Sequence, residues 1–348
     1  MFKKYVFLLK EEFTGYDFSK FQKDLLAGIT VAAVALPLAL AFGVSSGANA
    51  AAGLITAVIA GLVIGSLSGG FYQISGPTGA MAAILMSIAA TQGMQGVLLA
   101  TFLAGILLLL AGILRLGTLT SFIPAPVITG FTSGIAIIIA LGQVDNLFGV
   151  HSEGANVIEK LSSYHTLGFP VNIASFLMGF VVIVGMILYP KKWAAKVPSS
   201  LLAIILTTVV MLLFKLPIAA VGKIPQTLIS SDRLMINAFN LSALKEVMVP
   251  AISIALLGMV ESLLCGASAG RMANKPLDSN QELVAQGIGN LVLPFFGGIP
   301  ATAAIARTSV AIKSGAQTRL AGIIHAFVLF LSMIVFAPIM SNIPMPAL

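Results

Sequence analysis

The sequence predicts an all-α polytopic membrane protein with the inverted-repeat fold of a secondary transporter, on three observations. Of 348 residues, 58% are hydrophobic and 9% are charged, and the mean hydropathy is +1.04, which leaves too little polar surface for a soluble domain of this size. Apolar runs long enough to cross a bilayer recur along the chain. Two shorter runs each follow a Gly/Pro break, and such pairs are typical of inverted repeats.

The first 24 residues precede the first apolar run. They mix charged and aromatic residues and lack the continuous apolar stretch and small-residue cleavage site of a signal peptide. This composition predicts a short amphipathic helix on the membrane surface.

Nine apolar runs are candidates for complete crossings, because about 20 apolar residues span the hydrocarbon. They are residues 25–44, 50–67, 97–116, 123–141, 171–189, 201–214, 247–267, 284–296 and 320–340. Two further runs, 78–90 and 303–312, are too short to cross alone. The first follows the Gly/Pro break in "GGFYQISGPTG", and the second follows the break in "FFGGIPATA". Since proline and glycine interrupt helices, we expect these two runs to be half-helices that begin inside the membrane.

The basic residues support this count of eleven crossings. If the N-terminus is cytoplasmic and each half-helix counts with its lead-in as one crossing, thirteen Lys and Arg fall in inside segments and five in outside segments. This positive-inside asymmetry predicts a multi-pass protein of the cell (inner) membrane with a cytoplasmic N-terminus. The net charge of +7 then faces membrane lipid, so no nucleic-acid partner is implied.

Two charges, Glu261 and Arg307, remain in the membrane interior. Charges at that depth are costly and usually mark an ion or substrate path; the alternative is a structural Glu–Arg pair that holds helices together. A half-helix that starts at mid-membrane points free N–H groups and the positive end of its dipole into the protein, which favours an anion. Because "GPTGA" at 76–80 matches "IPATA" at 299–303, we expect one anion site between the two half-helix starts.

Four stretches resemble the SulP family of anion transporters, the bacterial relatives of the SLC26 carriers. They are "GITVAAVALPLALAFGVSSGANAAAGL", "QISGPTGAMAA", "VITGFTSGIAIII" and "SNQELVAQGIGNLVLPFFGGIPATAAIARTSVAIKSGAQTRLAG". The resemblance implies fourteen segments in two inverted sevens, with a core domain that moves against a gate domain, and a homodimer in the full-length form. It places an anion between the third and tenth segments and a cation-coupling carboxylate, Glu261, in the eighth. The implied anion-site residues are Phe42, Thr78, Gly79, Ala80, Ile305, Ala306 and Arg307.

The resemblance also implies a division of the chain. Residues 1–24 form the cytoplasmic N-terminus, 25–117 core segments one to four, 118–216 gate segments five to seven, 217–246 an extracellular loop and 247–341 core segments eight to eleven. We expect residues 342–348 to be the truncated start of segment twelve, which leaves the second repeat incomplete. The cytoplasmic STAS domain of the family is not expected in this chain.

The predicted function is secondary active transport of a small oxyanion of the sulfate, bicarbonate or dicarboxylate class. Proton symport by an elevator-like movement is preferred, because a buried carboxyl group such as Glu261 can take up a proton, and because Cys265, one turn later, is a poor sodium ligand. Sodium coupling and an anion channel at the same site remain alternatives. No metal site, cofactor or enzyme activity is predicted, and the sequence leaves the particular anion open.

Overall fold

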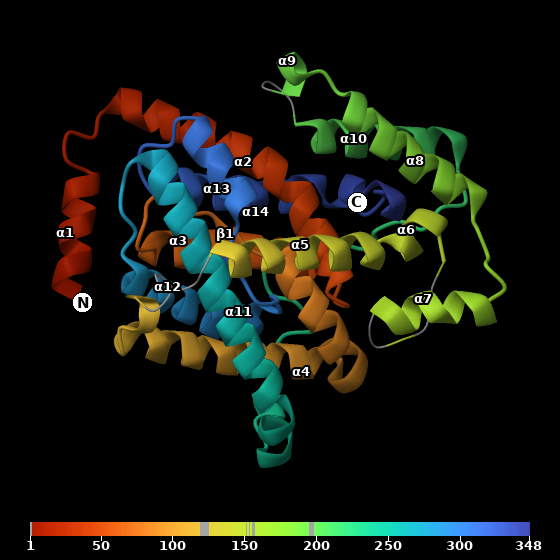
Figure 1. The fold of residues 1–348 in the computed structure, drawn as a ribbon. Coiled ribbons are helices and arrows are strands. Elements are labelled where there is room, and N and C mark those ends of the chain that lie inside the picture. The colour runs from red at the N-terminus through yellow and green to blue at the C-terminus, as the bar shows by residue number, and fades with distance from the viewer. Residues whose placement is uncertain (1, 119–124, 151, 153, 155–156, 195–197) are drawn as a thin grey trace.

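The computed structural model describes residues 2–118, 125–150, 152, 154, 157–194 and 198–348, and it is almost entirely helical (Figure 1). In the first part of the chain the helices are α1 (Phe2–Glu12), α2 (Phe18–Ser45), α3 (Ala50–Leu67), α4 (Gly79–Ile113), α5 (Ala125–Gly142), α6 (Val144–Phe148), α7 (Val157–Thr166), α8 (Ile173–Leu188), α9 (Lys191–Ala194) and α10 (Ser199–Phe214). The second part contains α11 (Leu241–Ala273), α12 (Ser279–Val292), α13 (Ile305–Lys313) and α14 (Leu320–Met340), with short 3-10 turns η2 (Ile236–Ala238), η3 (Leu293–Phe296) and η4 (Met345–Ala347). Two residue pairs, β1 (Ser75–Gly76) and β2 (Thr302–Ala303), form a two-stranded antiparallel sheet.

Several predicted boundaries are confirmed. The predicted runs 50–67 and 320–340 are helices α3 and α14 with the same bounds. The predicted N-terminal helix is α1, and α2 begins where the Asp17 side chain accepts a hydrogen bond from the Lys20 amide, which satisfies one of the free first-turn N–H groups. The first two residues of the predicted run 123–141 lie outside the described residues, and the rest of that run falls in α5.

The predicted separation between the half-helix 78–90 and the crossing 97–116 is confirmed, as a kink rather than a loop. Both pieces lie in the 35-residue stretch α4, which is broken at Gly93. Gly93 has φ 67° and ψ −175°, a backbone conformation open essentially to glycine alone. The chain therefore turns at Gly93 without leaving a loop between the two pieces.

The helices that carry the apolar character are α2, α3, α4, α11 and α14. Among the described residues these five are long and apolar enough to cross a membrane, and Ile173–Leu188 and Ser199–Phe214 are shorter apolar helices. The predicted crossing that contains 303–312 consists of the nine-residue helix α13 with the extended chain before it. Apolar helices of this kind confirm a polytopic membrane protein.

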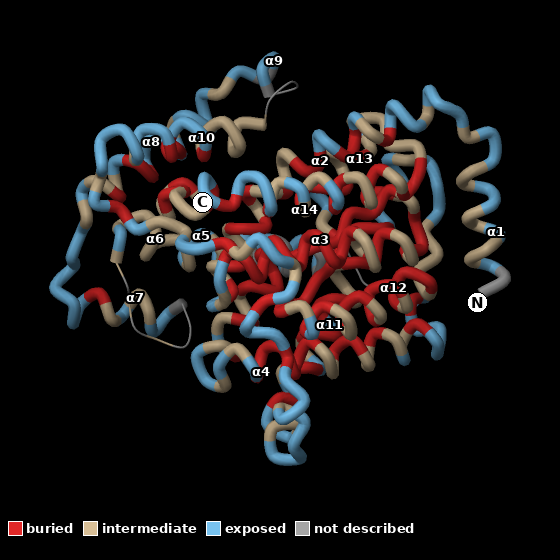
Figure 2. Tube along the Cα trace, turned by 180° about the vertical axis from the view of Figure 1, so that it is seen from behind, coloured by how far each residue is buried: buried red, intermediate tan, exposed pale blue. Residues whose placement is uncertain are grey.

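The helices form a packed group and a peripheral group, and the peripheral group consists of α5 to α10. The packed group contains α2, α3, α4 and α11 to α14, with α12 and α11 along α4 and with α14 along α2 and α3. Within it α3 is buried almost all round, whereas α7, α8 and α10 of the peripheral group are largely exposed (Figure 2). A helix that is apolar on every side belongs inside a bundle, so α3 forms the centre against which the site is built.

Candidate anion site

The two predicted half-helices begin side by side. Ser75 pairs with Ala303 and Gly76 pairs with Thr302 across the short antiparallel sheet, and α4 and α13 start two or three residues later. The residues that precede these helices, Thr78 and Ala304, make no side-chain capping hydrogen bond. The first-turn N–H groups of both helices are thus left without a cap, and such groups suit an anion.

Glu261 connects the two breaks. It lies in the middle of α11, where its Oε2 atom accepts a hydrogen bond from Thr78 Oγ1 at 3.0 Å and another from Thr302 Oγ1 at 2.7 Å. The two threonine oxygens are 3.1 Å apart. Three oxygen atoms from three separate segments therefore meet at one point between the helix starts.

Arg307 reaches from the second break into the first. Its side chain is 1% exposed, and Nη2 donates to the Pro77 carbonyl oxygen at 2.8 Å, whereas Nη1 has no protein partner among the described residues. A Cβ atom at Gly76 would lie only 2.4 Å from Nη1, so the guanidinium occupies space that only a glycine leaves free. A buried charge with an unused donor is costly unless a further group binds there.

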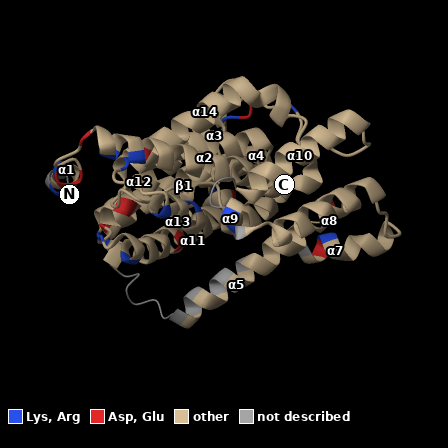
Figure 3. Cartoon of the chain, turned by 90° about the horizontal axis from the view of Figure 1, so that it is seen from above, with Lys and Arg blue, Asp and Glu red and all other residues tan. Residues whose placement is uncertain are grey.

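Glu261 and Arg307 do not form the structural pair that was the alternative reading of these charges. Within the described residues the ion pairs shorter than 4.0 Å are Lys4–Asp278, Lys275–Glu11 and Arg319–Glu12. Most of the ribbon is uncharged, and acidic and basic residues gather around α1 and at helix ends (Figure 3). The hydrogen-bond partners of the two interior charges are neutral groups: Thr78 and Thr302 for Glu261, and the Pro77 carbonyl for Arg307.

The other residues of the predicted site lie around the same helix starts. Gly79 and Ala80 are buried in the first turn of α4, and a Cβ atom at Gly79 would lie 3.0 Å from Cε1 of the half-buried Phe42 ring. Ile305 and Ala306 are exposed in the first turn of α13. The structure thus brings residues from α2, α4, α11 and α13 together at one place.

Sequence reasoning missed one member of this cluster. Thr302 is a hydrogen-bond donor to Glu261, although the sequence placed it only within the matched stretch "IPATA" and not among the residues of the site. In the antiparallel sheet Thr302 lies opposite Gly76. The signal that could have found Thr302 is that each break carries a single threonine close to its proline.

A shell of buried polar side chains holds both extended breaks. Asn290 accepts from the Ala301 amide at 2.9 Å and donates to the Ala301 carbonyl at 3.0 Å, and Thr56 Oγ1 accepts from the Ile299 amide at 2.8 Å. Gln286 donates to Ser75 Oγ at 2.9 Å. These bonds replace the helical bonds that the breaks lack, since buried backbone groups need partners.

Three charges that the sequence assigned to inside segments are buried in the structure. Glu282 and Asp24 are 0% exposed and Arg319 is 5% exposed. Glu282 accepts from Ser68 Oγ at 2.5 Å and from the Gly69 amide at 3.0 Å. The count of charges by segment said nothing of this burial, which comes from partners more than 200 residues away along the chain.

Comparison with known proteins places this geometry in a family. Residues 21–348 match the Sulfate permease family. The chain is 40% identical over 348 residues to "Putative sulfate transporter YvdB" of Bacillus subtilis, which covers 97% of this chain and 64% of the relative. It is 32% identical over 343 residues to "Bicarbonate transporter BicA" of Picosynechococcus sp., which covers 95% and 60%. The chain thus spans less than two thirds of the length of these relatives.

Solved structures agree. The transmembrane domain of a cyanobacterium bicarbonate transporter BicA matches with a TM-score of 0.90 at 32% identity, over 95% of this chain and 86% of that chain. Murine Slc26a9 in the inward-facing state matches in fold, with a TM-score of 0.87 at 19% identity over 100% of this chain and 62% of that chain. The family and these relatives are transporters, not enzymes. The chain therefore belongs to the sulfate permease family, SulP, and has the inverted-repeat membrane fold of the SLC26 and BicA transmembrane domains.

Proposed function

We propose that this protein is a secondary transporter that carries a small oxyanion, of the sulfate, bicarbonate or dicarboxylate class, across the inner membrane. The observation that carries the proposal is the pair of uncapped helix starts at α4 and α13 with the buried Arg307 beside them. Uncapped N–H groups and a positive charge inside a membrane protein favour an anionic ligand. The names of the relatives support sulfate and bicarbonate as the first substrates to test.

In this proposal the anion accepts hydrogen bonds from the first turns of α4 and α13, with Phe42 and Ile305 as neighbours. Arg307 adds positive potential behind these turns, held by the Pro77 carbonyl. An arginine stays charged under all relevant conditions, so Arg307 binds but does not switch.

Glu261 is the switch of the proposed cycle. As a carboxylate it accepts from Thr78 and Thr302; once protonated, it is neutral and no longer repels an anion at the neighbouring helix starts. Proton symport follows. Sodium is the competing ion, because the oxygens of Glu261, Thr78 and Thr302 suit a hard cation, although the nearby Cys265 donates to Thr308 at 3.5 Å and is a poor sodium ligand.

Transport requires that the site face each side of the membrane in turn. We assign the packed group of helices to the moving core and the peripheral group to the gate, with an elevator-like movement between them. The N-terminus would lie in the cytoplasm, as the positive-inside count indicates, and the full-length protein would be a homodimer.

Uptake into proteoliposomes tests this proposal. Labelled sulfate, bicarbonate and fumarate are offered under an inward proton gradient and then under an inward sodium gradient. The chain is assayed alone and joined to the C-terminal part of YvdB that lies beyond the matched region. We expect saturable uptake driven by protons, and we expect the gradient dependence to disappear in Glu261→Gln. Uptake driven by the sodium gradient would indicate that Glu261 binds sodium instead of a proton. Flux that does not saturate with anion concentration would indicate a channel. The absence of uptake of any of these anions by either form would contradict the proposal.

A further inference from the structure

The turn that follows the half-helix α13 is held by two carboxylates from the start of the chain. Three successive amides, those of Gln317, Thr318 and Arg319, donate to side chains of Asp24 and Glu12 at distances of 2.6 to 3.0 Å. The partners are separated by about 300 residues in sequence. We call these five residues the N-terminal clamp.

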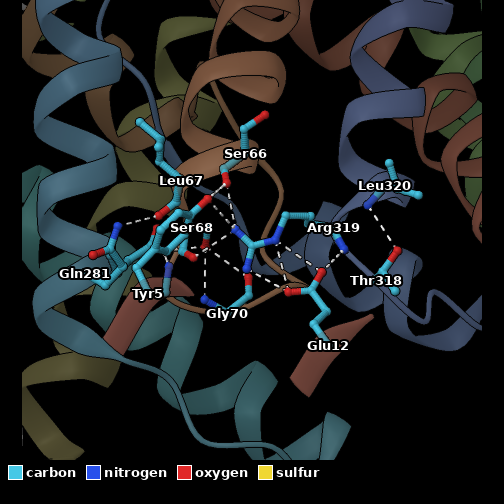
Figure 4. A network of polar contacts seen from close by, with 12 residues as sticks. Tyr5, Glu12, Ser66, Leu67, Ser68, Gly70, Gln281, Thr318, Arg319 and Leu320 are labelled. Atoms are coloured by element: carbon cyan, nitrogen blue, oxygen red, sulfur yellow. Dashed lines mark hydrogen bonds and ion pairs between the residues drawn. The ribbon is translucent and has the colours of Figure 1, made fainter. Parts of the chain in front are cut away.

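Arg319 forms the first half of the clamp, shown in Figure 4. Its Nη2 lies 2.7 Å from Glu12 Oε2, and the two side chains are only 6% and 7% exposed. Nη1 donates to the Ser66 carbonyl at 2.7 Å at the end of α3, and the guanidinium carbon lies 5.4 Å from the centre of the Tyr5 ring. A buried, multiply bonded arginine–carboxylate pair has a fixed geometry, so α1 is attached to α3 and α14 in one arrangement.

Asp24 forms the second half of the clamp. This carboxylate is 0% exposed and accepts from the Gln317 amide at 2.6 Å, from Thr318 Oγ1 at 2.6 Å and from Tyr16 Oη at 2.9 Å. Burial and the adjacent Asp24 raise the pKa of Tyr16 to about 12, so the phenol stays neutral and continues to donate. Hydrogen bonds thus surround a buried carboxylate that has no cation within 4.0 Å among the described residues.

All further ion pairs of α1 in the described chain also lead to the packed group. Lys4 lies 2.7 Å from Asp278 at the start of α12, and Glu11 lies 3.7 Å from Lys275 in the turn after α11. The half-helix α13 has only nine residues. The hydrogen bond from Arg307 to the Pro77 carbonyl holds its start, and the clamp holds the turn that follows its end.

We propose that α1 is a built-in part of the moving core. The Glu12–Arg319 half of the clamp locks α1 to the turn after the anion-site half-helix α13, the Asp24 half locks α2 to the same turn, and α1 moves with α13 during transport. The clamp itself is independent of the proposed function, whereas the statement about movement rests on it. A helix that only lay on the membrane surface would instead stay behind while the core moved.

Hydrogen exchange tests the clamp without any transport. We expect the amides of residues 314–320 to exchange at least about tenfold faster in Glu12→Gln or Asp24→Asn than in the unaltered protein, because each change removes a charged acceptor from the turn. Lys275→Gln is the matched control, since its pair with Glu11 is 57% exposed on both sides, and exchange in this turn should not change. Unaltered exchange in both clamp variants would overturn the proposal.

Cross-linking tests the movement. In a Cys265→Ser background, Glu11→Cys and Lys275→Cys are joined by a short bis(methanethiosulfonate) reagent. It forms a disulfide with each cysteine, with loss of methanesulfinate, and a reducing agent cleaves it; the link fastens α1 to the turn after α11. We expect uptake at the rate of the unlinked protein. Inhibition that is reversed by cleavage would show that α1 must detach, and would overturn the proposal. If the unlinked protein shows no uptake, the proposed function has failed, and the exchange experiment still decides the clamp.

Discussion

The Glu261 carboxylate accepts hydrogen bonds from both helix breaks. Thr78 comes from the first break and Thr302 from the second, and both donate to the same oxygen atom. A proton or a cation at that oxygen changes what both hydroxyls can do, because a protonated carboxyl group donates where the carboxylate accepted. Loading Glu261 is thus linked through two hydroxyl groups to the two helix starts where the anion is proposed to bind.

This link predicts a clear difference between two substitutions at Thr302. Thr302→Val keeps the shape but removes the 2.7 Å hydrogen bond, and loss of a bond to a buried charged group costs about 1–3 kcal/mol, or roughly tenfold in coupled uptake. Thr302→Ser keeps the hydroxyl and should retain most of the uptake. Initial rates of gradient-driven uptake in proteoliposomes measure the effect, and equal rates for Val and wild type would exclude Thr302 from the coupling.

Gly76 predicts a second effect at single-residue scale. A methyl group there would lie 2.4 Å from Arg307 Nη1, so Gly76→Ala should displace the guanidinium and weaken anion uptake by about tenfold or more, as expected for a loss of at least 1.4 kcal/mol at a buried charge. The matched control is Gly65→Ala in α3, where an added Cβ meets nothing within 4 Å. The concentration dependence of uptake for both variants distinguishes weaker binding from poor folding.

At the scale of elements, the sequence located the two breaks but not where their helices begin. Proline and glycine mark where a helix cannot continue, which is why the runs beginning near Thr78 and Ala303 were recognised. The start of α13 at Ile305 depends on the pairing of β1 with β2, a contact between Ser75 and Ala303, which are 228 residues apart in sequence. No local pattern carries that information.

Buried charges show the same limit more sharply. Asp24, Glu282 and Arg319 sit at segment ends, where charge counting assigns them to the inside face. Their burial comes from partners such as Ser68 for Glu282 and Glu12 for Arg319. Glu261 and Arg307, in contrast, were found because the count of inside and outside segments leaves them within predicted crossings. Composition thus predicts depth in the membrane, but not enclosure by the fold.

The break in α4 supports a prediction about one element. Gly93 has φ 67° and ψ −175°, and an added Cβ would meet nothing within 4 Å. Gly93→Ala therefore adds no clash but forces a strained backbone, at a cost of about 1–3 kcal/mol. We expect a lower midpoint of thermal unfolding for the purified protein, whereas the control Gly65→Ala, inside helix α3, should not lower the midpoint. An unaltered midpoint would mean that the α4 turn relaxes at no cost.

At the scale of the whole molecule, the packed and peripheral groups meet around a cavity of about 210 Å³. Its lining includes Ser45 at the end of α2, Ala83 in α4 and Gln143 between α5 and α6, and it extends to Gly79 at the predicted anion site. An open space between two groups of helices is where relative movement can occur without repacking a core. The cavity therefore lies at the boundary between the packed group, which we propose to move, and the peripheral group, which we propose to stay in place.

This separation predicts the opposite outcome from the cross-link on α1. In the Cys265→Ser background, Ser45→Cys and Gln143→Cys joined by the same short reagent tie α2 to the peripheral group across the cavity. If transport requires these groups to shift, uptake should fall by about tenfold or more, since conformational steps limit such cycles, and cleavage of the linker should restore it. Each single cysteine variant, treated in the same way, controls for blocking of the cavity by the reagent. Undiminished uptake in the linked protein would mean that the two groups move as one body, and the boundary between core and gate would then have to lie elsewhere.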